Sequence, residues 1–214
     1  MRIAIIGGNL ARRLTALGYQ VTIANSRGPQ TLGQLADETG ARAVPIGEVA
    51  AGAALVVVAV PEGRVPDLPD DVLAGAAADV VVIDTGNYYP QRDGRLSGIE
   101  DDGVTESRWV ERQLSHPVVK GFDNVYAANL IEAARPADVT DRMAVPIAAD
   151  DPAAKQIVSD LVDQLGFDPV DAGGLDDSWR QQPGTPAYGV TADVAGMRRL
   201  LDQASPERTA QWRG

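Results

Sequence analysis

Glycines directly after the first apolar run are the first candidates for chemistry in this sequence. The run Ile3–Ile6 leads without interruption into Gly7, Gly8 and Asn9. When such a strand is followed by a helix and a second strand, the glycines let the turn approach a pyrophosphate, and the N–H groups at the start of the helix attract its charge. The pattern therefore predicts a dinucleotide-binding turn at residues 7–9.

The end of the second apolar run indicates which dinucleotide would bind. Val21–Ala24 is followed by Asn25, Ser26 and Arg27, with no Asp or Glu at the tip of the strand. An acid there would accept a hydrogen bond from a ribose 2′-hydroxyl and repel a 2′-phosphate, whereas a hydroxyl and a guanidinium can hold that phosphate. Ser26 and Arg27 therefore favour NADP(H) over NAD(H). The alternative for Arg27 is a solvated surface side chain.

Few side chain types are available for proton chemistry. The sequence has no Cys and a single His, His116, which excludes disulfides, thiolate nucleophiles and imidazole metal clusters, so we expect no metal. Lys120, at the end of an apolar run, could orient a substrate carbonyl or donate a proton, or extend to solvent as a structural lysine. Tyr88 is the other candidate proton donor. We expect Asp84 to cap loop amides, the alternative being that it acts as an acid if it is buried, and we expect His116 to be solvated.

Aromatic residues are scarce, at 5% of the chain, and four of them fall in expected loops. A fold that brings Tyr88, Tyr89, Trp179 and Tyr188 together would give a flat wall for a planar ring. The alternative is that they plug the core beneath long loops. Trp109 and Trp212 are expected to serve packing only.

Arg180 is followed by two amides, Gln181 and Gln182. This trio could hold an anionic or carbonyl-bearing tail of a ligand through paired hydrogen bonds. A surface salt bridge is the alternative for Arg180.

The elements that must position these residues form a repeating pattern. Apolar runs of strand length alternate with helical stretches, and the runs are almost continuously apolar, as strands covered on both faces require. We therefore expect a doubly wound, Rossmann-like α/β fold with a mainly parallel sheet. The expected strands are Ile3–Ile6, Val21–Ala24, Leu55–Val60, Val80–Ile83, Val118–Val119, Met143–Ala148 and Asp168–Asp171. The expected helices are Leu10–Leu17, Thr31–Thr39, Asp151–Leu165 and Thr191–Gln203, and Gly18, Gly40 and Gly166 end the first three.

Length and charge limit the partners. The 214 residues suit one domain, which we divide into residues 1–172, the nucleotide-binding part, and 173–214, an extension of loop and helix that folds back on it. The net charge of −11 repels nucleic acid and anionic membranes. We expect a cytoplasmic protein, because the apolar run at Met1–Gly7 is too short for a signal peptide or a membrane-spanning helix. We expect a homodimer, because two-fold dimers are the commonest assemblies.

Several segments together resemble a known family. The opening Met1–Gly7, and the segments Asn25–Pro29, Val57–Pro61, Ile83–Asn87 and Val119–Asn124, resemble the coenzyme F420:NADP oxidoreductases, and the resemblance covers most of the chain. Ser178–Pro186 looks like the signature of one branch of that family.

The resemblance carries implications for individual residues. It implies that Ser26 and Arg27 contact the 2′-phosphate. It also implies that the turn Ala59-Val60-Pro61 and the loop residues Thr85 and Asn87 surround the nicotinamide half. Pro61 could adopt a cis peptide bond there, although most such bonds are trans.

The glycine turn departs from the family pattern. Gly7-Gly8-Asn9 runs directly into Leu10, so about five residues of the usual fingerprint are missing. Either a loop segment is absent from this sequence, which we favour, or the chain carries a real deletion that impairs the phosphate site.

Three functions are consistent with these features. The preferred one is hydride transfer between NADP(H) and a second planar carrier, the deazaflavin coenzyme F420 or a flavin, because such chemistry belongs to the two rings and needs mainly orientation. The second is NADPH-dependent reduction of a small carbonyl or imine, which needs a proton donor. The third is a nucleotide sensor that has lost catalysis through its short glycine turn.

Overall fold

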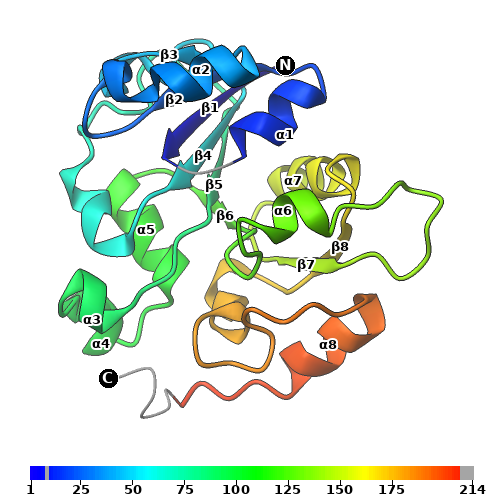
Figure 1. Cartoon of the computed structure of the whole chain (residues 1–214). Helices are drawn as coiled ribbons and strands as arrows, with labels where there is room; N and C mark the ends of the chain where they lie inside the picture. Colours follow the sequence, from blue (N-terminus) through cyan, green and yellow to red (C-terminus); the bar gives the residue numbers. More distant parts are fainter. Residues whose placement is uncertain (8–9, 208–214) are drawn as a thin grey trace.

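Six parallel strands form the centre of the molecule (Figure 1). The computed structural model describes residues 1–7 and 10–207. The sheet has the order β3-β2-β1-β4-β5-β6, and all its pairings are parallel. Its strands are β1 (Arg2–Gly7), β2 (Gln20–Ala24), β3 (Arg42–Ala43), β4 (Leu55–Ala59), β5 (Val81–Asp84) and β6 (Val118–Lys120). The strand order reverses between β1 and β4, as in dinucleotide-binding folds, and confirms the predicted Rossmann-like architecture.

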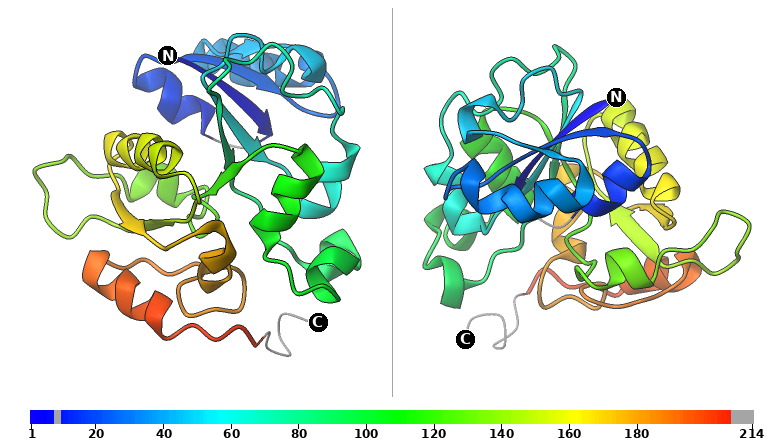
Figure 2. Two further views of the ribbon diagram at one scale, coloured as in Figure 1. Left: turned by 180° about the vertical axis from the view of Figure 1, so that it is seen from behind. Right: turned by 45° about the horizontal axis from the view of Figure 1, so that its top comes forward.

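Helices cover both faces of this sheet because alternate strand residues point to opposite sides. Ile3 and Ile5 of β1 pack in one core with α1 (Ala11–Ala16) and α7 (Pro152–Gln164). Ala4 and Ile6 pack in the other core with α5 (Glu106–Leu114). The views in Figure 2 show these helices on either side of the strands. Because both faces of the sheet are covered, the strands are almost continuously apolar and do not alternate with polar residues.

A second, smaller sheet follows β6. In it β7 (Ala144–Ile147) pairs in parallel with β8 (Asp168–Asp171), and α7 and α8 (Val194–Asp202) lie against the pair. The expectation that Met143–Ala148 extends the main sheet is therefore wrong. The chain reaches β7 through loops and a single turn of helix, without a crossover helix on the face of the sheet, and meets β6 only through an antiparallel bridge between Lys120 and Ala148.

The glycine stops predicted for the helices are confirmed. Gly18, Gly40 and Gly166 have φ angles of 83°, 74° and 92°, in the left-handed region that closes a helix. Asp151 caps α7 by accepting a hydrogen bond from the Ala153 N–H at 2.8 Å. The remaining helices are α2 (Gly33–Thr39), α3 (Pro90–Asp93), α4 (Ser97–Glu100), α6 (Asn129–Glu132) and the 3-10 helices η1 (Pro29–Leu32), η2 (Ile46–Glu48), η3 (Glu62–Asp67) and η4 (Leu175–Gln181).

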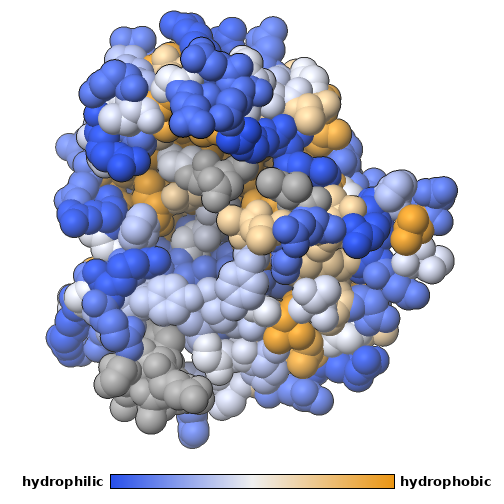
Figure 3. All heavy atoms as spheres, viewed as in Figure 1, coloured by the Kyte–Doolittle hydropathy of each residue, from blue (hydrophilic) through white to orange (hydrophobic). Residues whose placement is uncertain are grey.

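The C-terminal part packs on the smaller sheet. Met197 and Leu201 of α8 are buried against Val170 of β8 and Ala144 of β7. The division of the chain into a nucleotide-binding part, residues 1–172, and an extension, residues 173–214, stays a prediction. Among the described residues, no helix combines the length and apolar character needed to span a bilayer. The face seen in Figure 3 is mostly hydrophilic, with apolar side chains gathered in a few patches.

Candidate cofactor and active site

The carboxyl ends of the central strands bring most of the predicted residues to one edge of the sheet. Gly7 of β1 pairs with Ala59 of β4, and Asp84 of β5 pairs with Lys120 of β6. Since ligands of open α/β sheets bind beyond these ends, next to the point where the strand order reverses, this edge is the candidate site.

Gly7 is required where β1 meets β4. Its φ is 81°, and a side chain on it would clash with the Ala59 carbonyl oxygen. The backbone therefore comes close to β4 only because this position is glycine. Gly8 and Asn9, the rest of the predicted pyrophosphate turn, lie outside the described residues.

The turn after β2 presents Ser26 and Arg27 to solvent. The Asn25 side chain shapes the turn, since its Oδ1 accepts a hydrogen bond from the Arg27 N–H at 3.0 Å and its Nδ2 donates to Thr31 Oγ1 at 3.0 Å. In the described part of the chain, no residue pairs with the Arg27 guanidinium. An exposed, unpaired guanidinium on an ordered turn fits a 2′-phosphate.

The turn after β4 lies where the sequence predicts it, but it contains no cis peptide bond. Ala59 and Val60 are half-buried at the edge, and Pro61 is exposed. Every peptide bond in the described residues is trans, so the idea of a cis Pro61 is wrong.

The loop after β5, residues 85–87, is held in place by hydrogen bonds to neighbouring residues of the protein. Thr85 donates both its N–H and its hydroxyl to the Val58 carbonyl, at 3.1 and 3.3 Å. The Gly86 N–H donates to Asp84 Oδ1 at 2.8 Å, which confirms the capping role expected for Asp84. Asn87 Nδ2 donates to the Asp123 carbonyl at 2.9 Å, while its buried Oδ1 has no partner among the described residues.

Lys120 is a buried anchor of that loop and does not reach solvent. Its side chain is 1% exposed, and Nζ donates to the Gly86 carbonyl at 2.5 Å and to Asp84 Oδ2 at 3.3 Å. Burial acts to lower the pKa of Lys120, but the carboxylates of Asp84 and Asp123 outweigh it and raise the pKa well above its ordinary value. Lys120 stays protonated, so this geometry argues against donation to a substrate.

Tyr88 also lies in the core. It has no exposed surface, and its hydroxyl donates to the Gly94 carbonyl at 2.8 Å and contacts Glu100. The expectation that Tyr88 joins an aromatic wall is therefore wrong. Neighbouring residues of an extended chain point in opposite directions, and here Tyr88 points inward while Tyr89 points to the edge.

The aromatic wall consists of tyrosines. The rings of Tyr89 and Tyr188 meet edge to face, with centroids 6.5 Å apart, and their hydroxyls are hydrogen-bonded. Burial, followed by the contact with Tyr89, raises the pKa of Tyr188. Tyr126, which the sequence did not single out, lies beside Gly189 and is 57% exposed.

Polar side chains after β6 complete the edge. Asp123 is 5% exposed; its Oδ1 accepts a hydrogen bond from Gln181 Nε2 at 2.9 Å, and its Oδ2 has no partner in the described part. Burial raises the pKa of Asp123 to about 6. Asn124 is also buried, with its whole amide unpaired there. Phe122, with φ of 64°, has the strained backbone often found at functional sites.

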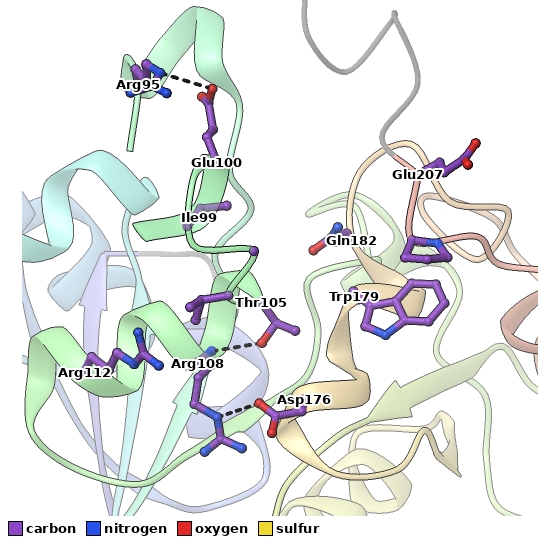
Figure 4. A pocket seen from close by; sticks show the side chains of 13 residues that line it. Arg95, Ile99, Glu100, Thr105, Arg108, Arg112, Asp176, Trp179, Gln182 and Glu207 are labelled. Atoms are coloured by element: carbon purple, nitrogen blue, oxygen red, sulfur yellow. Dashed lines mark hydrogen bonds and ion pairs between the residues drawn. The ribbon is translucent and has the colours of Figure 1, made fainter. Parts of the chain in front are cut away.

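Trp179 lines a cavity whose described lining includes no tyrosine (Figure 4). This cavity, of about 1240 Å³, lies between the segment around α4 and α5 and the segment containing η4. Gln182 lines it with Trp179, whereas Gln181 points to Asp123. Arg180 stacks on Trp179, 5.7 Å from the ring centre, and lies 3.9 Å from Asp177. The expected trio from Arg180 to Gln182 is therefore divided between two places.

The other singled-out residues are structural or remote. Trp109 is buried against the sheet, as expected, and Trp212 lies outside the described residues. His116 precedes β6, at the opposite edge of the sheet, and its Nδ1 contacts the Pro117 carbonyl at 2.8 Å.

Comparisons with solved structures agree with the overall architecture. A hypothetical protein, SMa0349, from Sinorhizobium meliloti is 29% identical with a TM-score of 0.75, and the match covers 90% of this chain and 95% of that one. A candidate F420-dependent NADP-reductase from Arthrobacter sp. FB24 is 26% identical with a TM-score of 0.66, over 82% of this chain and 86% of that one.

A family model matches the N-terminal part of the chain, and a curated relative matches a stretch of 63 residues. The protein YjhV of Escherichia coli is 48% identical over 63 residues, which span 29% of this chain and 46% of that protein. Residues 2–88 match the family described as NADP oxidoreductase, coenzyme F420-dependent. Through these residues the N-terminal part of the chain is similar to the coenzyme F420-dependent NADP oxidoreductases.

Proposed function

We propose that this protein is an NADP oxidoreductase that passes a hydride between NADP(H), bound along the carboxyl edge of the main sheet, and a second planar carrier. The carrier is coenzyme F420 or a flavin. In this arrangement Ser26 and Arg27 hold the 2′-phosphate, Gly7 lies next to the pyrophosphate, and Thr85 and Asn87 lie beside the nicotinamide.

One observation supports a planar carrier over a small carbonyl substrate. The two side chains expected to donate a proton, on Tyr88 and Lys120, are buried and hydrogen-bonded inside the protein. The edge instead offers the rings of Tyr89 and Tyr188, with Tyr126 exposed nearby. Aromatic faces bind planar rings, and transfer between two rings requires orientation more than a dedicated donor.

A second candidate is reduction of a small carbonyl or imine. Asp123 favours it, because a buried carboxyl with one unpaired oxygen and a pKa near 6 can hold a proton at this edge. Gln181 fixes the orientation of this carboxyl.

The deciding experiment supplies the purified protein with NADPH and, separately, coenzyme F420, FMN, a small ketone and a cyclic imine. We expect NADPH oxidation that depends on the deazaflavin or the flavin. Turnover with the ketone or imine alone would replace the first candidate by the second. Binding of NADPH without turnover of any acceptor would support the nucleotide-sensor function. If NADPH does not bind, the short glycine turn is a real deletion that impairs the phosphate site.

The homodimer and the cytoplasmic location stay predictions. Light scattering of the purified protein tests the first, and fractionation of cells expressing the chain tests the second.

A further inference from the structure

Glu62 lies directly beneath the loop that we assign to the nicotinamide. It begins η3, immediately after Pro61, and has no exposed surface. Its Oε1 is 2.7 Å from the position that a Cβ atom would occupy on Gly86, the middle residue of the loop. Glu62 therefore contacts, from inside the protein, the loop whose outer residues are Thr85 and Asn87.

The Glu62 carboxyl has no hydrogen-bond partner among the described residues, on either oxygen. A buried carboxylate without donors is strongly disfavoured, because nothing replaces the water it has lost. A buried carboxyl in such a place is therefore neutral and holds its proton.

The surrounding charges lead to the same conclusion. Three other carboxyls face Glu62, from Asp84 of β5, Glu106 of α5 and Asp93 of α3, and the cations nearby are Lys120 of β6 and Arg92 of α3.

Both cations are already engaged. Lys120 donates to Asp84 and to the loop carbonyl, and Arg92 pairs with Asp93. A charged Glu62 would add another negative charge without a cation of its own. Burial, followed by the charge of Asp84, raises the pKa of Glu62 well above its ordinary value.

We propose that Glu62 is the proton-holding residue beneath the nicotinamide site, and that it releases its proton when the cofactor above it is in the oxidised form. This inference rests on the proposed placing of NADP(H) at the carboxyl edge. It makes Glu62 a positioning residue that acts through the Thr85–Asn87 loop and through its charge.

The charge of the two cofactor forms gives the physical reason. Bound NADPH supplies a hydride and becomes NADP⁺, whose nicotinamide carries a positive charge. A positive charge above the loop favours the ionised form of a nearby carboxyl, and the interaction is strong where water is excluded.

The protons balance over a full reaction. The carrier gains one hydride from NADPH and one proton from solvent, and Glu62 releases one proton to solvent and becomes a carboxylate. Glu62 regains a proton from solvent after NADP⁺ leaves. In the complex with NADP⁺ alone, the released proton goes to the buffer.

Proton release can be counted by calorimetry. Titrations of the whole chain with NADP⁺ and with NADPH, in buffers of different ionisation enthalpy, give the number of protons released by each form. The phosphates are common to both forms, so their titration cancels in the difference. We expect NADP⁺ to release up to one proton more than NADPH. The Kd of NADP⁺ should then fall by up to about tenfold per pH unit over the range in which Glu62 titrates.

Glu62→Gln keeps the shape of the side chain but removes the carboxyl proton that Glu62 is proposed to release. We expect this variant to bind NADPH as the wild type does and to lose the difference in proton release. Glu48→Gln, which changes an exposed glutamate of η2, is the matched control and should keep that difference. If Glu62→Gln does not fold, infrared difference spectra of the wild-type complexes serve instead, and should lose a protonated-carboxyl band with NADP⁺.

Two results would overturn the inference. Equal proton release by NADP⁺ and NADPH would show that no group responds to the nicotinamide charge. An undiminished difference in Glu62→Gln would assign the proton to another acid. Failure of both forms to bind would instead refute the proposed cofactor site, so the two failures are distinguishable.

Discussion

Lys120 and Asp84 form a buried ion pair across the ends of β6 and β5, with Nζ 3.3 Å from Oδ2 and both side chains 1% exposed. Ser107 of α5 also donates to Asp84 Oδ2, at 2.6 Å. The pair joins two strand ends, a helix and the backbone of Gly86. The loop that faces the cofactor site is therefore fixed before any ligand binds.

Removing the lysine should destabilise the fold. In Lys120→Met the Asp84 carboxylate stays buried without its cation, which typically costs about 3–5 kcal/mol. Urea denaturation followed by circular dichroism measures the change in the free energy of unfolding. The double variant Lys120→Met with Asp84→Asn should recover part of the loss, because the Asp84 charge is then removed together with its partner. A loss below about 1 kcal/mol in the single variant would contradict the role of the pair.

Arg27→Ala should weaken NADPH binding and leave NADH binding unchanged, because only NADPH carries the 2′-phosphate. The expected loss is about 1.5–3 kcal/mol, the usual value of a hydrogen bond to a charged group. Fluorescence titration with both nucleotides measures it. Arg64→Ala is the control, since Arg64 is an exposed arginine of η3 whose partner is Asp67. Equal weakening of both nucleotides by Arg27→Ala would refute the assignment to the phosphate.

Gly86→Ala tests how tightly the loop is seated. The added Cβ would lie 2.7 Å from Glu62 Oε1 and 3.0 Å from Asp84 Oδ1, so either a buried carboxyl or the loop must move. We expect a loss of about 1–3 kcal/mol in the free energy of unfolding. Gly33→Ala is the matched control, because Gly33 begins α2 with nothing within 4 Å of its Cβ position. That change should be neutral or stabilise by about 0.5–1 kcal/mol.

Asp123 should make stability depend on pH. Its pKa is about 6 in the folded protein against an ordinary 3.8, so between these values the folded state binds more protons than the unfolded state. The free energy of unfolding then decreases as pH rises through this range.

Asp123→Asn removes that dependence while keeping an acceptor for Gln181. Relative to this variant, the free energy of unfolding of the wild type should decrease by up to about 3 kcal/mol between pH 4 and pH 7. Thermal or urea unfolding of both proteins across that range gives the difference. If the difference in unfolding free energy between the two proteins stays constant over this pH range, the raised pKa of Asp123 is contradicted.

Local patterns predicted most of the sheet and the ends of the helices. Apolar runs identify strands such as Leu55–Ala59 because burial on both faces leaves no polar position. Gly40 and Gly166 predict helix ends because their backbone conformation is a local property. The helix Glu106–Leu114 was missed, because it is mostly polar, with only Trp109 and Val110 as buried apolar residues.

The inner layer of the site could not be predicted in this way. Glu62 is buried because β5, α3 and α5 meet around it, and no local pattern distinguishes it from a solvated glutamate after a strand. Tyr126 lies near Tyr188 only because two distant loops fold over the same edge. The sequence thus indicates which loops form the site, whereas long-range packing decides which side chains face the ligand.

Tyr126→Ala tests the aromatic wall with little effect on the fold, because this side chain is 57% exposed. An aromatic contact contributes about 0.5–1.5 kcal/mol beyond the area it buries, so the KM for the second carrier should rise about 2- to 13-fold. Steady-state kinetics at saturating NADPH measures this rise, and the Kd of NADPH should not change. Tyr126→Phe keeps the ring and should restore the wild-type KM. If Tyr126→Ala leaves the KM of every carrier unchanged, Tyr126 does not belong to the carrier site, and the carrier must bind on another face of the edge.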